Sequence, residues 1–91
     1  MKLDHAIRAE IARVAVGLGA SRAEGKRISG RPRSEIHRAL SNLGADRLLL
    51  AVVSSWRDSN DEVGVLNSLR ELNANGDFKF FRLPPENGAA Q

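Results

Sequence analysis

Apolar residues near the start of the chain recur at the three- and four-residue spacing of an amphipathic helix. From Asp4 onward, with Arg8 and Arg13 outside it, the apolar stripe consists of Ile7, Ile11, Val14 and Leu18. This periodicity predicts a helix with one buried face. We expect Asp4 to be its N-cap, because Asp accepts hydrogen bonds from the first free amides of a helix. Gly17 and Gly19 should end it, since glycine tolerates the backbone conformation of a helix terminus.

The apolar pattern lapses between Gly19 and Pro32, where small and charged residues dominate and Ile28 is the single large apolar residue. Such a stretch is either a basic loop or a short helix flanked by turns. Pro32 suits the first turn of a helix, because its fixed φ is already helical. The residues that follow predict a helix ending at Gly44, with a narrow apolar stripe formed by Ile36, Leu40 and Leu43.

The segment from Asp46 to Trp56 is compatible with two structures. Its LLLAVV run could be a buried strand. Helical spacing instead places six residues on one broad apolar face: Ala45, Leu48, Leu49, Val52, Val53 and Trp56. Since Leu and Ala favour helix, we expect a helix here. The strand alternative would give an α+β fold with a βαβ-like unit from residues 47 to 83.

A further helix is predicted after Ser59. The residues Ser59 to Glu62 have the form of a capping box, in which the Ser hydroxyl accepts from a helical amide and the Glu carboxylate reaches back. The helix should end at Asn75-Gly76, and its apolar face consists of Val65, Leu66, Leu69 and Leu72. Beyond it, the FKFFRL run predicts a short extended segment that stops at Pro84-Pro85.

These elements together predict a mainly α fold, a small bundle of about four short helices with a C-terminal extended segment. A chain of 91 residues is long enough for one compact domain. We expect that domain to span residues 1–83, with a basic segment at residues 19–33, and residues 84–91 to form a disordered tail.

The charge of the chain is unevenly distributed. Residues 1–33 contain eight Lys or Arg against three acidic residues, whereas residues 34–91 contain six against eight. A basic end favours an anionic partner, either nucleic acid or an acidic protein surface. The absence of cysteine suits a reducing compartment, and the longest apolar run, residues 48–53, is too short to cross a bilayer. We therefore expect a cytoplasmic protein that does not enter the membrane.

The basic segment carries a motif of its own. Val14-Ala15 is followed by Gly19-Ala20-Ser21-Arg22-Ala23, then by Arg27-Ile28 and by Gly30-Arg31-Pro32. In this order the string resembles the DNA-reading helix-turn-helix of lac-repressor-type regulators, over less than a quarter of the chain. The resemblance implies that Ser21, Arg22 and Lys26 face DNA and that Arg27, Arg31 and Arg33 lie near phosphates. The chain departs from the family at Gly25, where a branched apolar residue is usual.

The same cations bind phosphates without a recognition helix, in a salt-sensitive and sequence-independent way. Our leading hypothesis is a small, non-enzymatic nucleic-acid-binding or regulatory protein. The candidate anion-binding residues are Ser21, Arg22, Lys26, Arg27, Arg31 and Arg33. The alternative is a protein-binding adaptor or inhibitor, of the kind that mobile elements encode, that docks its basic end on an acidic partner.

Aromatic residues offer a second candidate surface. Phe78, Phe80 and Phe81 are interleaved with cations, as in proteins that bind single strands, but such a trio more often closes a core. Trp56 is either a core residue or the anchor of a protein interface. The other candidates for such an interface are Phe78, Phe80 and Phe81. Domains this small often self-associate, so a homodimer is a further expectation.

No residues suggest a metal, a cofactor or catalysis. His5 and His37, the two histidines, lie on different predicted helices without clustered acids. Ser34, His37 and Ser41 share one helical face but lack the orienting acid that a nucleophile needs. We therefore expect a binding protein without cofactor rather than an enzyme.

Overall fold

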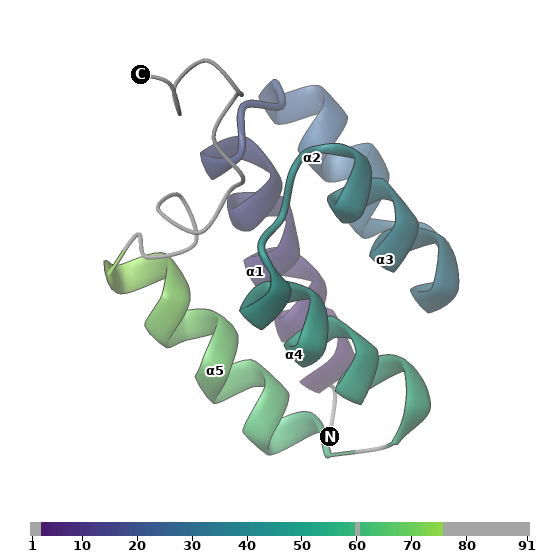
Figure 1. Ribbon diagram of the computed structural model, residues 1–91, viewed down its shortest axis with the longest axis vertical. Helices are drawn as coiled ribbons and strands as arrows, with labels where there is room; N and C mark the ends of the chain where they lie inside the picture. The colour runs from purple at the N-terminus through teal and green to yellow at the C-terminus, as the bar shows by residue number, and fades with distance from the viewer. Residues whose placement is uncertain (1–2, 60, 76–91) are drawn as a thin grey trace.

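The computed structural model describes residues 3–59 and 61–75. The described chain forms five helices and no strand (Figure 1): α1 (Leu3–Gly17), α2 (Arg22–Ser29), α3 (Arg33–Asn42), α4 (Arg47–Asp58) and α5 (Glu62–Asn75). The predicted mainly α bundle is confirmed. It has one helix more than expected, because the basic stretch contains a short helix flanked by turns rather than a loop.

The ambiguous segment around Leu48 to Val53 is helical, so the βαβ alternative is wrong. Asp46 is the N-cap of α4, since its buried side chain accepts a hydrogen bond from the Leu49 amide at 2.9 Å. The apolar face of α4 is narrower than predicted. Leu49, Val53 and Trp56 are fully buried, whereas Leu48 remains 50% exposed.

The predicted apolar stripes meet in one core. The helix α1 packs against α2 and α5, while α4 packs against α3 and α5. Figure 1 shows α5 at one side of the bundle and α2 and α3 at the other, with α1 and α4 between them. The side chains with no exposed surface are Ile7, Ile11, Val14, Ala15, Ile36, Leu40, Leu49, Val53, Trp56 and Leu69.

The short helix α2 is held by a close approach to α1. Its two buried residues are Gly25 and Ile28. A Cβ atom added to Gly25 would lie 2.9 Å from the Ala12 carbonyl oxygen and 3.3 Å from a methyl group of Val16. Gly25, which departs from the lac-repressor pattern, therefore allows α2 to pack on α1 where a larger residue would not fit.

Two predicted helix starts differ in detail from the structure. Asp4 lies inside the first turn of α1 instead of preceding it, because α1 begins at Leu3. Ser59 forms no capping box, since its amide and hydroxyl both donate to the Ser55 carbonyl at the end of α4. Asp61 caps α5 instead, and its carboxylate accepts from the Gly64 amide at 3.2 Å.

The predicted helix ends at glycines are confirmed at two turns. Gly19, after α1, has φ of +116°, and Gly44, after α3, has φ of +90°. Both values lie in the region that glycine adopts without strain. The helix α5 is described as far as Asn75, and Gly76, its predicted end, lies outside the described residues. The predicted extended segment and tail lie outside the described residues. Among the described helices, none has the length and apolar character to cross a membrane.

We predict that Gly25→Ala lowers the free energy of unfolding by about 1 kcal/mol, because the steric cost of overpacking exceeds the gain in helix propensity. Urea denaturation followed by circular dichroism measures the change. Gly30→Ala is the matched control, because an added Cβ there meets nothing closer than 3.7 Å. Equal stabilities for the two variants would contradict the close packing of α2 on α1.

Candidate anion-binding surface

The six residues predicted to bind anions do not form one site. Ser21 precedes α2, and its hydroxyl oxygen accepts a hydrogen bond from the Glu24 amide at 3.1 Å. Ser21 is therefore the N-cap residue of α2. Of the five cations, Arg33 is held inside the bundle, while Arg22, Lys26, Arg27 and Arg31 are exposed.

Arg33 opens α3 and binds groups from three other helices. One terminal nitrogen, Nη1, donates to the Trp56 carbonyl at 2.8 Å. The other, Nη2, donates to Asp4 Oδ1 at 3.0 Å and to Glu62 Oε2 at 3.3 Å. Its guanidinium carbon lies 4.5 Å from the centroid of the Trp56 ring, a cation–π geometry. Arg33 therefore joins α1, α3, α4 and α5, and its side chain is only 26% exposed.

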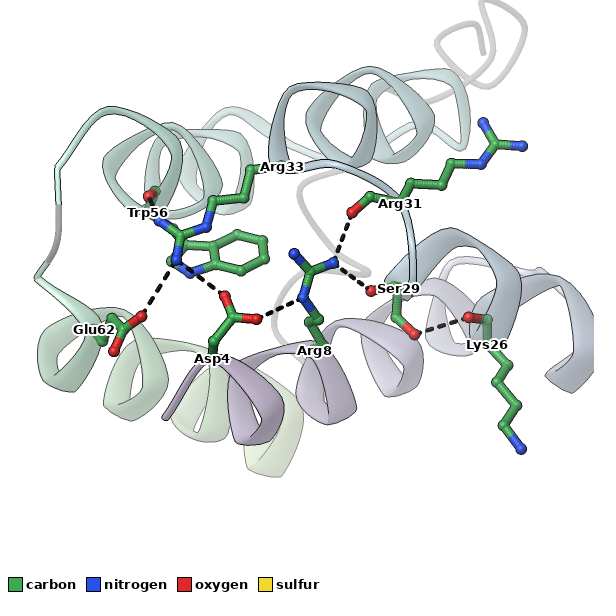
Figure 2. A network of polar contacts seen from close by, with 8 residues as sticks. All are labelled: Asp4, Arg8, Lys26, Ser29, Arg31, Arg33, Trp56 and Glu62. Atoms are coloured by element: carbon green, nitrogen blue, oxygen red, sulfur yellow. Dashed lines mark hydrogen bonds and ion pairs between the residues drawn. The ribbon is translucent and has the colours of Figure 1, made fainter. Parts of the chain in front are cut away.

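Arg8 makes a second such junction on the other side of Asp4. Its Nε donates to Asp4 Oδ2 at 2.7 Å, and its Nη1 donates to the carbonyls of Ser29 at 2.8 Å and Arg31 at 2.6 Å. These carbonyls belong to the end of α2 and the turn after it, where a cation is favoured by the helix dipole. Figure 2 shows the Asp4 carboxylate between the two guanidinium groups. Arg8 thus fixes the turn between α2 and α3.

The titration of Asp4 reflects this position. Burial alone would raise the pKa of its carboxyl group, but hydrogen bonds from Arg8 and Arg33, together with their positive charges, lower the pKa below its ordinary value. Asp4 is consequently ionised throughout the neutral range. The two guanidinium groups that it bridges would otherwise repel each other.

Trp56 is the apolar floor of this cluster. It is fully buried, and the guanidinium carbon of Arg8 lies 5.2 Å from the centroid of its ring. We call the group formed by Asp4, Arg8, Arg33 and Trp56 the Asp4 cluster. Trp56 therefore lies in the core, and the hypothesis that it anchors a protein interface is wrong for this structure, since a partner could not reach it. Within the described chain, its Nε1–H has no hydrogen-bond partner. Phe78, Phe80 and Phe81, the other interface candidates, lie outside the described residues.

Three of the exposed cations share the outer surface of α2. At about 100° per residue, Arg22, Lys26 and Arg27 fall within an arc of about 140°, opposite the buried Gly25 and Ile28. Arg27 pairs with Glu24 at 2.6 Å, but its side chain remains 63% exposed. Arg22 and Lys26 form no ion pair within the described chain. We call these three cations the basic face of α2.

Arg31 points elsewhere. Figure 2 shows its side chain and that of Lys26 directed away from the Asp4 cluster on different sides of the chain. Arg31 lines a hollow between α2 and α3 together with Arg38, Glu24 and Glu35. Because cations and acids alternate there, this hollow is less suited to an anion than the basic face of α2.

A groove between α1 and α2 borders the basic face. Its floor is made of small apolar residues, and its charged lining residues are all basic: Arg8, Arg13, Arg22 and Lys26, with His5 at one end. Within residues 3–59 and 61–75, no carboxylate lines it. The sequence predicted only that Arg13 lies outside the apolar stripe of α1. It could not predict that Arg13 lines a groove with residues of α2, because the turn at residues 18–21 decides which face of α1 meets α2.

The ion pairs of Asp4 with Arg8 and of Glu62 with Arg33 were not predicted from the sequence. The spacing of four between Asp4 and Arg8 is a readable signal for an ion pair within one helix. The capping-box interpretation assigned Glu62 to its own helix terminus, whereas its carboxylate binds Arg33 of α3. No local sequence pattern predicts the ion pair between Arg33 and Glu62, which are 29 residues apart.

Comparisons with protein families, with curated proteins and with solved structures find no match to this chain. The order helix, turn, helix that the lac-repressor resemblance implied is present in α1, residues 18–21 and α2. The base-reading roles of Ser21, Arg22 and Lys26 stay predictions. Function is therefore inferred from the geometry of the residues themselves.

We predict that the Asp4 ion pairs make stability fall in acid. A folded-state pKa below the ordinary value of 3.8 means that the stabilisation is complete above about pH 5 and is lost as the pH falls through the folded-state pKa. The difference in unfolding free energy between the wild type and Asp4→Asn should be constant near neutral pH and shrink below about pH 4. Urea denaturation over a pH series measures it. A difference that stays constant down to pH 2 would contradict these contacts.

Proposed function

We propose that this protein binds nucleic acid through the basic face of α2, without catalysing a reaction. The observation that carries the proposal is that Arg22, Lys26 and Arg27 share one exposed side of a helix. Lysine and arginine side chains in such a row neutralise successive phosphates and release condensed counterions. Arginine adds bidentate contact with phosphate oxygens. Because these contacts go to the backbone, we propose that binding is independent of base sequence.

The division of the cations supports the proposal. Arg8 and Arg33 are engaged with carboxylates and carbonyl groups of the bundle, so they are not available to a ligand. The arginine and lysine side chains of α2 are instead exposed on an element that Gly25 and Ile28 hold against the core. The short helix thus presents its charges from a fixed platform, which reduces the entropy lost on binding.

We further propose that the protein is regulatory and acts in the cytoplasm, because a chain without cysteine suits a reducing environment. Its affinity should lie in the range of non-specific binders, with a dissociation constant of about 1 to 100 μM at physiological salt. Three phosphate contacts predict a slope of about −2.7 in the logarithm of affinity against the logarithm of salt concentration.

We predict that a fluorescently labelled duplex binds the purified protein at low salt and that raising the salt from about 50 to about 200 mM lowers the affinity roughly 40-fold. Fluorescence anisotropy with duplex DNA and duplex RNA of the same sequence measures both affinities. The triple variant Arg22→Gln, Lys26→Gln, Arg27→Gln should abolish binding in this concentration range. All three side chains are exposed, so circular dichroism should show an unchanged fold.

The matched control removes the same charge elsewhere. Arg38, Arg47 and Arg70 are exposed and lie on α3, α4 and α5. Their replacement by Gln should change the affinity by no more than about threefold, because distant surface charges are screened. Absence of binding at low salt, or equal losses in the two triple variants, would overturn the proposed function.

A further inference from the structure

We propose that the groove between α1 and α2 is a docking site for an acidic amphipathic helix of a protein partner. This inference goes beyond nucleic-acid binding and does not rest on it. It starts from the two kinds of residue that line the groove, which together match one kind of ligand.

The floor of the groove is apolar and shallow. It is formed by Ala9 and Ala12 of α1, Ala23 of α2 and the side chain of Val16. Val16 is 42% exposed, one of three large apolar residues of the described chain that the core leaves uncovered. Small residues allow the backbone of another helix to approach closely and leave room for its larger apolar side chains. The floor thus offers apolar contact without being filled by the protein itself.

The rim of the groove is basic on both sides. Arg13 extends from α1, and Arg22 and Lys26 extend from α2. In the described part of the chain, Arg13 has a single long polar contact, 3.4 Å to Glu10, and its side chain is 71% exposed. Because none of the described lining residues is a carboxylate, a ligand of complementary charge must carry acids along both flanks.

The length of the groove suits a helix. On α1 the lining runs from His5 to Val16, which is about 16 Å, or three helical turns. A helix of that length presents apolar side chains at positions i, i+4 and i+7 on one face. Its flanking positions would place Asp or Glu opposite Arg13 on one side and opposite Arg22 and Lys26 on the other.

Nucleic acid fits this groove less well than it fits the outer face of α2. Phosphates gain nothing from the apolar floor. Among the residues that the structure describes, no aromatic ring lines the groove to stack on a base. The combination of an apolar floor and a cationic rim therefore favours a protein helix for the groove itself.

The test uses a synthetic amphipathic peptide of about 16 residues, with Leu at i, i+4, i+7 and i+11 and Glu on both flanks, and a scrambled peptide of the same composition. Isothermal titration calorimetry with the full chain measures both affinities. We expect the amphipathic peptide to bind at least about tenfold more tightly than the scrambled one, because only the former joins apolar and charged contacts. Equal binding of the two peptides, or no binding of either, would overturn the proposal.

Two matched variants test the position of the peptide. Val16→Asn should lower the affinity for the amphipathic peptide about tenfold, because it places an amide on the apolar floor. Val63→Asn makes the same change at a 61% exposed valine of α5 outside the groove, and it should leave the affinity unchanged. Neither variant alters a cation, so duplex DNA affinity serves as a separate readout. The docking site is wrongly placed if both variants bind the peptide equally.

Discussion

The bundle depends on a carboxylate held between two guanidinium groups above one buried indole. Asp4 binds Arg8 and Arg33, and both cations lie over the ring of Trp56. Removing one charge from such a partly buried cluster leaves the others unpaired, which costs more than breaking a surface ion pair. Because Arg33 also binds Glu62 and the Trp56 carbonyl, this cluster fixes how α1, α3, α4 and α5 meet.

This cluster also determines which cations remain for a partner. Arg8 binds two carbonyls at the end of α2, and so it sets the direction in which α3 departs. The cations of the basic segment, residues 19–33, therefore have two roles: some hold the bundle together and others remain exposed on its surface. Arg33 belongs to the interior, whereas Arg22, Lys26 and Arg27 are left on the outside of a helix that Gly25 seats against α1. Fewer cations are accessible to a partner than a count of basic residues suggests, but Arg22, Lys26 and Arg27 lie on one side of one helix.

Local pattern predicted most of the fold and little of the site. Helical periodicity identifies apolar stripes such as that of α1, because burying one face of a helix imposes a period of 3.6 residues on its apolar positions. It overestimated the buried face of α4, since Leu48 satisfies the period but remains 50% exposed, at a hollow that it lines together with residues of α5. The role of Arg33 could not be read, because its partners lie 23 to 29 residues away and a lone arginine carries no sign of its orientation. Long-range ion pairs depend on packing that composition does not encode.

The arginines of the described chain thus form two populations, one internal and one exposed. Nuclear magnetic resonance of the arginine side-chain N–H groups tests this division most directly. The account predicts that the signals of Arg8 and Arg33 exchange slowly with water and keep their positions when duplex DNA is added, whereas those of Arg22 and Arg27 exchange rapidly and shift. If Arg33 exchanged as fast as Arg22, or shifted with the DNA, the division between structural and binding cations would be contradicted.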